Sequence, residues 1–311
     1  MLQLSRRENR LVLYKKRAWR SRYLLLMMMF PFVYLIIFAY IPMYGAQIAF
    51  REYNPSSGIW GSEWVGFAHF KSFFGSVFFG RLLRNTLVIS ITQLVFTFPL
   101  PIIIALMLNE VMNRHVKRTI QTVIYLPHFI SVVVVAGLVF AVLSPSSGII
   151  NRIIVFFGNE PVYFFNEPKY FPFIVALREV WQNTGWGTIV YLAAITSIDP
   201  SLYEAAVVDG ANRFKQLVSI TLPAIMPTIV VLFILRIGGI FTLGYQGILL
   251  LYNPTIFETS DIIQTFVYRR GLAGMEYSFG TAVDMFNSIC NLIMLLVFNR
   301  IMRRVSETSL W

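Results

Sequence analysis

The polar side chains that could bind a ligand lie close together in one apolar stretch of the chain. At the i, i+3, i+4 and i+7 spacing of a single helical face stand Glu179, Gln182, Asn183 and Trp186, with Trp181 nearby but off that face. Amides and carboxylates bind sugar hydroxyls, and aromatic rings cover the apolar C–H faces of sugars. The pattern therefore predicts a carbohydrate site. A polar seam between helices, with an interfacial tryptophan, would give the same spacing.

Arg236, in the middle of another apolar stretch, is a second candidate. A charge at that depth is costly, so its guanidinium must face a cavity or a partner. It could form an internal ion pair with Asp284 or Glu179. It could instead bind the carboxylate of an acidic sugar, which a guanidinium grips through two parallel hydrogen bonds. Asp284 and Asn287, at i and i+3, could line the same cavity or bond to neighbouring helices. Arg178 is a weaker candidate because it could sit at the outer membrane interface.

Patterns that would support catalysis or hold a metal do not occur in the sequence. One cysteine, Cys290, excludes an internal disulfide, and three scattered histidines have no metal-ligand spacing. Without any Gly-Lys dipeptide there is no Walker A loop to hold a nucleotide. The ionisable residues form neither an acid-base cluster nor a Ser-His-Asp arrangement. We therefore expect a chain that is not an enzyme and binds no metal or cofactor itself.

The composition is that of a polytopic membrane protein. Hydrophobic residues make up 57% of the chain and charged residues 13%, whereas soluble domains carry about 25% charged residues. A helix needs about 20 apolar residues to cross the hydrocarbon of a bilayer. Six segments reach that length, which predicts an all-α chain with six transmembrane helices. They are residues 24–44, 86–108, 123–143, 174–198, 223–247 and 279–298.

Basic residues lie mainly on one side of these six helices. The segments before residue 24, over 109–122, over 199–222 and after 298 hold sixteen Lys and Arg residues, and the longer opposite loops hold eight. Loops rich in Lys and Arg stay in the cytoplasm, so we expect both termini there. The net charge of +11 is then mostly a topology signal, and nucleic acid is not an expected partner.

This topology divides the chain into five parts. They are a basic cytoplasmic segment (1–23), the first transmembrane helix (24–44), an extracytoplasmic loop (45–85), a five-helix core with a cytoplasmic loop (86–298) and a cytoplasmic tail (299–311).

The loop over residues 199–222 predicts a short helix, a bend and a second helix. Asp199 can cap a helix that starts at the proline after it, and Ser201 begins a Ser-x-x-Glu capping box. Gly210 can take the positive φ that ends such a helix. A second helical segment over 211–220 would then lead into the next transmembrane helix. Small side chains leave this surface open to close approach by another protein.

The same loop resembles the EAA loop of permease subunits in binding-protein-dependent ABC importers, which has the pattern E-A-A-x3-G-x9-I-x-L-P. The matching residues are Glu204, Ala205, Ala206, Gly210, Ile220, Leu222 and Pro223. The resemblance implies a type I importer permease fold and a coupling helix that docks in a cytoplasmic ATPase. The coupling residues it implies are Tyr203, Glu204, Ala205, Ala206, Asp209, Gly210 and Ala211. An ordinary amphipathic connector is the alternative for this loop.

The resemblance extends over most of the chain and also implies partners and a substrate class. The VGFAHFKSFF segment and the C-terminal SLW are similar to LplB-type permeases, a group associated with complex oligosaccharides. The family implies a second, different permease subunit, two copies of the ATPase and an extracytoplasmic solute-binding protein. ATP and Mg would bind to the ATPase alone.

Similarity to the maltose-transporting permease adds candidate sugar contacts. Glu179, Gln182, Asn183, Arg236 and His128 fall near that permease's sugar-contacting positions, but the charges of Glu179 and Arg236 depart from its pattern and disfavour maltose. We expect import of an oligosaccharide, with an acidic one from pectin or alginate, a neutral one or another small solute all open. A membrane-embedded enzyme and a passive channel are the rival classes.

Overall fold

The computed structural model describes residues 19–242, 244–305 and 310, and these divide between two compact units, residues 1–69 and 70–311. Of the expected basic segment over 1–23, residues 1–18 lie outside the described residues. So does most of the C-terminal SLW. Each unit is described by itself.

The first unit is a long apolar helix followed by a small polar loop. The helix runs over Arg22–Phe50 and is built from α2 (Arg22–Leu35), a π-helical turn, α3 (Ile41–Met43) and a 3₁₀ stretch. It has 29 residues, and an 18-residue stretch of it has a mean hydropathy of 2.5, enough to cross a bilayer. After it, β1 (Arg51–Glu52) pairs antiparallel with β2 (Glu63–Trp64) around the short helix α4 (Gly58–Gly61).

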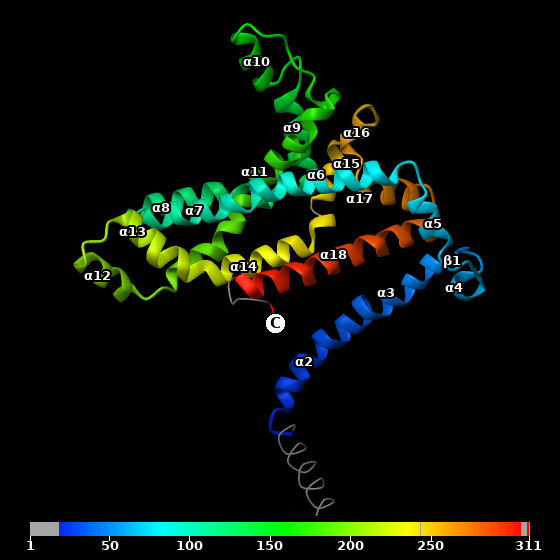
Figure 1. Ribbon diagram of the computed structural model, residues 1–311, viewed down its shortest axis with the longest axis horizontal. Helices are drawn as coiled ribbons and strands as arrows, with labels where there is room; N and C mark the ends of the chain where they lie inside the picture. Colours follow the sequence, from blue (N-terminus) through cyan, green and yellow to red (C-terminus); the bar gives the residue numbers. More distant parts are fainter. Residues whose placement is uncertain (1–18, 243, 306–309, 311) are drawn as a thin grey trace, which may run out of the picture. The chain divides into compact units, whose positions relative to one another are not determined.

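The second unit consists of helices joined by short 3₁₀ and π-helical turns (Figure 1). They are α5 (Ala68–Phe74), α6 (Phe79–Thr97), α7 (Pro99–Glu110), α8 (Arg114–Tyr125), α9 (Val132–Leu143), α10 (Ile149–Phe156), α11 (Phe171–Thr196), α12 (Pro200–Val208), α13 (Arg213–Gln216), α14 (Leu222–Gly238), α15 (Tyr245–Leu251), α16 (Phe257–Ser260), α17 (Ile263–Phe266) and α18 (Tyr277–Val305).

Helix α11 is the central element of this unit. It packs against α6, α7, α8, α9, α14 and α15, and more than half of its residues are buried. One apolar cluster surrounds its first half through Phe171 and Val175, and another surrounds its second half through Tyr191 and Ile195. Helix α14 packs along α18 as well as against α11. Polar groups on α11 are therefore enclosed by neighbouring helices rather than by lipid.

The segment over 123–143 is not the single helix that we expected. The helical stretch Arg114–Phe129 and helix α9 meet at an angle of 101°. The α-helix stops at Tyr125 because Pro127 has no N–H to continue the ladder, and a 3₁₀ turn follows. The extended backbone of Ile130 then leads into α9, whose first turn is capped by the Ser131 hydroxyl at 3.3 Å from the Val134 nitrogen.

The expected helix over 223–247 is also interrupted. The helical run starts earlier, at Arg213, passes through α13 and a π-helical turn into α14, and ends at Gly238. Gly238 lies against Leu295 of α18 so closely that a Cβ on it would be 2.6 Å from the Leu295 Cδ1 atom. A 3₁₀ turn and the positive φ of Gly244 then start α15 as a separate short helix.

Among the described residues, four helices are long and apolar enough to cross a membrane, or five when the bent pair counts as one span. Helix α11 has 26 residues, also long enough to span, but its polar residues lower its hydropathy. Together these elements agree with the predicted all-α architecture of about six spans.

Candidate functional site

The predicted polar face of α11 exists and is buried. Glu179 is 8% exposed and Gln182 is 6% exposed, and Asn183 lies beside them. Arg178, a weaker candidate because it could sit at the outer interface, is only 4% exposed. The outer-interface alternative is wrong, because the Arg178 side chain lies on the packed face of α11, where it is 2% exposed and bonded to Glu179 and Gln182.

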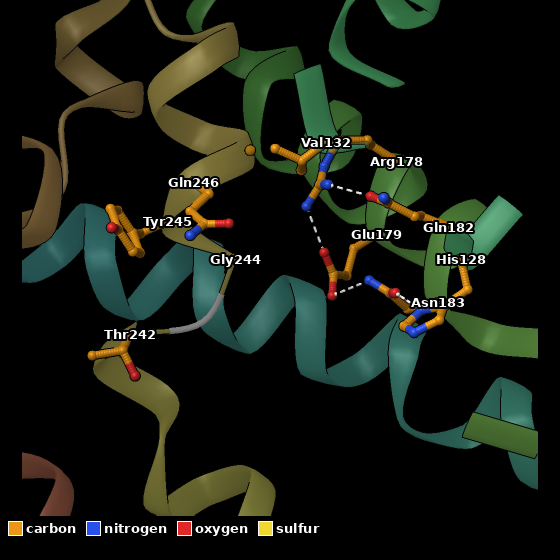
Figure 2. A pocket seen from close by; sticks show the side chains of 11 residues that line it. His128, Val132, Arg178, Glu179, Gln182, Asn183, Thr242, Gly244, Tyr245 and Gln246 are labelled. Atoms are coloured by element: carbon orange, nitrogen blue, oxygen red, sulfur yellow. Dashed lines mark hydrogen bonds and ion pairs between the residues drawn. The ribbon is translucent and has the colours of Figure 1, made fainter. Parts of the chain in front are cut away.

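These side chains form one hydrogen-bond network (Figure 2). The Arg178 guanidinium donates to Glu179 Oε2 and, at 2.8 Å, to Gln182 Oε1. Asn183 Nδ2 donates to Glu179 Oε1 at 2.8 Å. Because the Asn183 amide nitrogen is used in this way, its Oδ1 atom accepts from His128 Nδ1 at 2.9 Å. The network links the centre of α11 to the bend before α9.

A cavity of about 350 Å³ opens beside this network. One wall is the α11 face with His128, and the other is the segment that follows α14, seen opposite it in Figure 2. The lining residues are His128, Val132, Arg178, Glu179, Gln182, Asn183, Thr242, Gly244, Tyr245, Gln246 and Gly247. We call this space the outer cavity, because it lies nearer the start of α11 than the second cavity described below.

The second wall was missed in the sequence, where residues 240–247 read as the end of a transmembrane helix. Gly247 is the informative residue: a Cβ there would lie 2.5 Å from the Arg178 Cζ atom. Only glycine lets the guanidinium approach the backbone so closely. The glycines of this short segment, Gly244 and Gly247, were the available signal that the chain leaves the helix to enclose a site.

Arg236 reaches the same network from α14. Its Nη2 atom lies 3.7 Å from Glu179 Oε1 and 3.4 Å from Thr97 Oγ1. Asp284 and Glu179 were the two possible ion-pair partners of Arg236, and in the structure the partner is Glu179. The pair does not neutralise the site, because Arg178 and Arg236 contribute two positive charges and Glu179 only one negative charge.

Besides Arg236, four other predicted ligand contacts do not line the outer cavity. Trp186 stacks on the His128 ring at a centroid distance of 4.5 Å and so helps to hold the orientation of that ring. Trp181 is 49% exposed. Asp284 accepts from Gln264 Nε2 at 3.1 Å, and Asn287 is fully buried within α18's packing. Neither residue lines the cavity, and of the two alternatives for Asp284 the structure has the bond to a neighbouring helix.

The loop over 199–222 has the predicted helix, bend and helix. Asp199 caps α12 by accepting from the Ser201 backbone N–H at 2.9 Å, and that hydrogen bond lowers the pKa of the Asp199 carboxyl. The N-cap of α12 is therefore Asp199, and Ser201 lies in the first turn of the helix. Ser201 does not begin a capping box, as its spacing from Glu204 had suggested. Gly210 has a φ of 74° and ends the helix, and Asn212 caps α13. Figure 1 shows α12 and α13 at the ends of α11 and α14.

This loop presents an open, partly apolar surface. Val207 is 62% exposed, Val208 86% and Phe214 73%. A cavity of about 620 Å³ beside them is lined by Tyr203, Glu204, Val207, Ala211, Asn212, Arg213 and Gln216. The Tyr203 hydroxyl is 2.8 Å from that of Thr221, so α12 is tied to the start of α14. Exposed apolar side chains on a rigid, tied helix are typical of a protein-docking surface.

Comparison with known proteins agrees with this architecture. Residues 97–307 match the family described as binding-protein-dependent transport system inner membrane component. Over 292 residues the chain is 44% identical to the polygalacturonan/rhamnogalacturonan transport system permease protein YteP of Bacillus subtilis (94% of this chain, 91% of that protein). It is 42% identical to protein LplB of the same organism (94% and 92%).

A solved bacterial ABC transporter, involved in the import of the acidic polysaccharide alginate, contains a chain with the same fold. The TM-score is 0.85 at 44% sequence identity, covering 94% of this chain and 98% of that one. The resemblance drawn from the EAA loop is thereby confirmed. The chain belongs to the family of inner-membrane permease components of binding-protein-dependent ABC transport systems, and it is a transporter subunit, not an enzyme.

Proposed function

We propose that this permease imports acidic oligosaccharides and that the outer cavity binds a uronate carboxylate. The observation that carries the proposal is the charge of the network: Arg178 and Arg236 share the single carboxylate of Glu179. An excess positive charge inside a membrane protein is costly unless a ligand or partner compensates it. The carboxylate of a sugar acid would do so, while the amides of Gln182 and Asn183 are suited to its hydroxyls.

The relatives support this substrate class. One is described as a polygalacturonan/rhamnogalacturonan permease, and the solved neighbour as an importer of an acidic polysaccharide. The lining of the outer cavity also favours an acidic sugar over a neutral one, because it contains the buried Arg178, whose Nε atom has no hydrogen-bond partner.

We infer that the energy comes from a separate chain. In this proposal both termini are cytoplasmic, and two copies of an ATPase dock on the 199–222 loops of this permease and a second one. An extracytoplasmic binding protein delivers the sugar. Because Tyr203 ties α12 to the start of α14, a movement of the ATPase would be passed to the helix that carries Arg236. ATP and Mg are held by the ATPase.

The substrate proposal is tested by Arg178→Gln in the importer assembled in nanodiscs without the binding protein. We expect binding of tri-galacturonate to weaken about tenfold or more, because a charge-assisted hydrogen bond is lost. Binding of the same trisaccharide with its carboxyls reduced to alcohols should change less than about twofold. Equilibrium dialysis of the labelled sugars measures both. Arg178→Lys keeps the positive charge but cannot form two parallel hydrogen bonds. Its affinity for tri-galacturonate should therefore lie between those of Arg178→Gln and the wild type. Equal losses for both sugars would refute an acidic-ligand role.

The coupling proposal is tested at Gly210. No atom lies within 4 Å of the Cβ that a substitution would add, so the positive φ alone decides the outcome. Gly210→Val should cost about 1–2 kcal/mol at the bend and lower the number of sugars imported per ATP hydrolysed severalfold. Gly210→Asn, which tolerates this φ, should remain close to wild type. Transport and hydrolysis are measured together in proteoliposomes. An unchanged ratio in Gly210→Val would contradict the coupling role.

A further inference from the structure

A second cavity of about 240 Å³ lies further along α11 than the outer cavity. It lies between the end of α6, α7, α11 and α14 and is lined by Thr97, Phe98, Pro101, Asn183, Thr184, Gly187, Val190, Tyr191, Leu232 and Arg236. Its α11 residues continue from Asn183 for about 12 Å toward the 199–222 loop. We call it the inner cavity.

The inner cavity contains polar groups that the structure leaves unsatisfied. Thr184 is only 6% exposed, and its buried Oγ1 atom has no hydrogen-bond partner. A threonine on a helix normally satisfies its hydroxyl by donating to a carbonyl one turn earlier, as Thr188 does to Thr184 here. An orphaned buried hydroxyl costs about 1–3 kcal/mol, which a bound ligand would recover. Across the cavity the Arg236 guanidinium and Thr97 hydroxyl add further donors, with only a 3.4 Å contact between them.

The boundary between the two cavities is the Glu179–Arg236 ion pair. Glu179 lines the outer cavity, Arg236 lines the inner one, and Asn183 lines both. The 3.7 Å separation between Arg236 Nη2 and Glu179 Oε1 is long for a hydrogen bond, and the Arg236 side chain is 34% exposed. Arg236 is thus held loosely, whereas Arg178 is buried and bonded directly to Glu179 and Gln182.

We propose that the inner cavity is a second uronate site on the way to the cytoplasm, which the sugar occupies after the outer cavity. This rests on the proposed acidic substrate. The carboxylate first binds beside Arg178. Arg236 then exchanges the Glu179 carboxylate for that of the sugar, whose oxygens accept from Arg236 and from the hydroxyls of Thr97 and Thr184. When Arg236 releases Glu179, the ion pair between the two cavities is broken. The sugar carboxylate that binds Arg236 therefore opens its own path into the inner cavity.

The test is Thr184→Val, measured in the complete importer in proteoliposomes with its binding protein. The change removes an unpartnered hydroxyl at nearly constant shape, so the thermal midpoint should stay the same or rise. The maximal rate of tri-galacturonate uptake should nevertheless fall about fivefold, without a change in the half-saturating concentration. Thr184→Ser should restore the rate. If the hydroxyl had a purely structural role, its removal would lower the thermal midpoint and leave the uptake rate of the folded importer unchanged.

The outcomes separate this inference from the substrate proposal. If Arg178→Gln discriminates acidic from reduced sugar while Thr184→Val and Thr97→Val both transport at the wild-type rate, the inner site is refuted and the acidic substrate stands. If the two threonine variants slow the acidic and the reduced sugar equally, the inner cavity does not bind a carboxylate. If Arg178→Gln fails to discriminate as well, the acidic substrate falls with it.

Discussion

Glu179→Gln is expected to destabilise the permease by about 3 kcal/mol, because breaking a buried ion pair leaves the remaining charge without compensation. The side chains of Glu179 and Arg178 are 10% and 2% exposed, so water cannot take over from the lost carboxylate. Arg236 loses its only carboxylate partner among the described residues at the same time. A lower thermal midpoint in nanodiscs and the loss of most sugar uptake should follow.

A matched control exists at the Arg270–Glu276 pair. Its nitrogen–oxygen distance is 2.8 Å, but the two side chains are 37% and 44% exposed. Glu276→Gln makes the same chemical change where water screens the charges, so it should cost less than about 1 kcal/mol.

Combining Glu179→Gln with Arg178→Gln should recover part of the lost stability, because both ends of the buried pair are then neutral. Equal midpoints for Glu179→Gln and Glu276→Gln would mean that the network is not buried from solvent.

Gly185→Ala is expected to have a comparably large effect, through sterics rather than charge. A Cβ at Gly185 would lie 1.8 Å from the carbonyl oxygen of Ile124, where α11 crosses the end of α8. A backbone atom cannot rotate away as a side chain can, so the helices must separate. We expect a cost of about 3 kcal/mol, at the upper end for overpacking. The displaced bend would also take His128 away from Asn183.

Gly187, one half-turn further on, provides the control for this substitution. A Cβ there would meet Pro101 Cγ at 3.2 Å, a side-chain contact that a shift of a few tenths of an ångström relieves. Gly187→Ala should therefore cost less than about 1 kcal/mol. Thermal midpoints and the yield of assembled importer compare the two variants. If both substitutions were tolerated equally, α8 and α11 would not be in the close contact that positions His128.

Much of the candidate site was predictable from local pattern. Helical spacing alone placed Glu179, Gln182 and Asn183 on one face, and all three line the outer cavity. The depth of Arg236 in an apolar segment predicted a partner, with Glu179 among the two considered. Arg178 was ranked too low, because the position of a residue along α11 does not tell whether its side chain is packed against neighbouring helices.

The sequence by itself determined the apolar character of the chain, the polar face of α11 and the bent loop over 199–222, because hydrophobicity, helical period and capping act between residues close in the chain. Only the tertiary structure decided that Arg178 and Arg236 share one carboxylate and that the segment after α14 closes the cavity. It also decided that α18 contributes nothing to this cavity. Those results depend on which helices pack together, and the bend at Pro127 and the break at Gly238 redirect the chain in ways that periodicity does not encode.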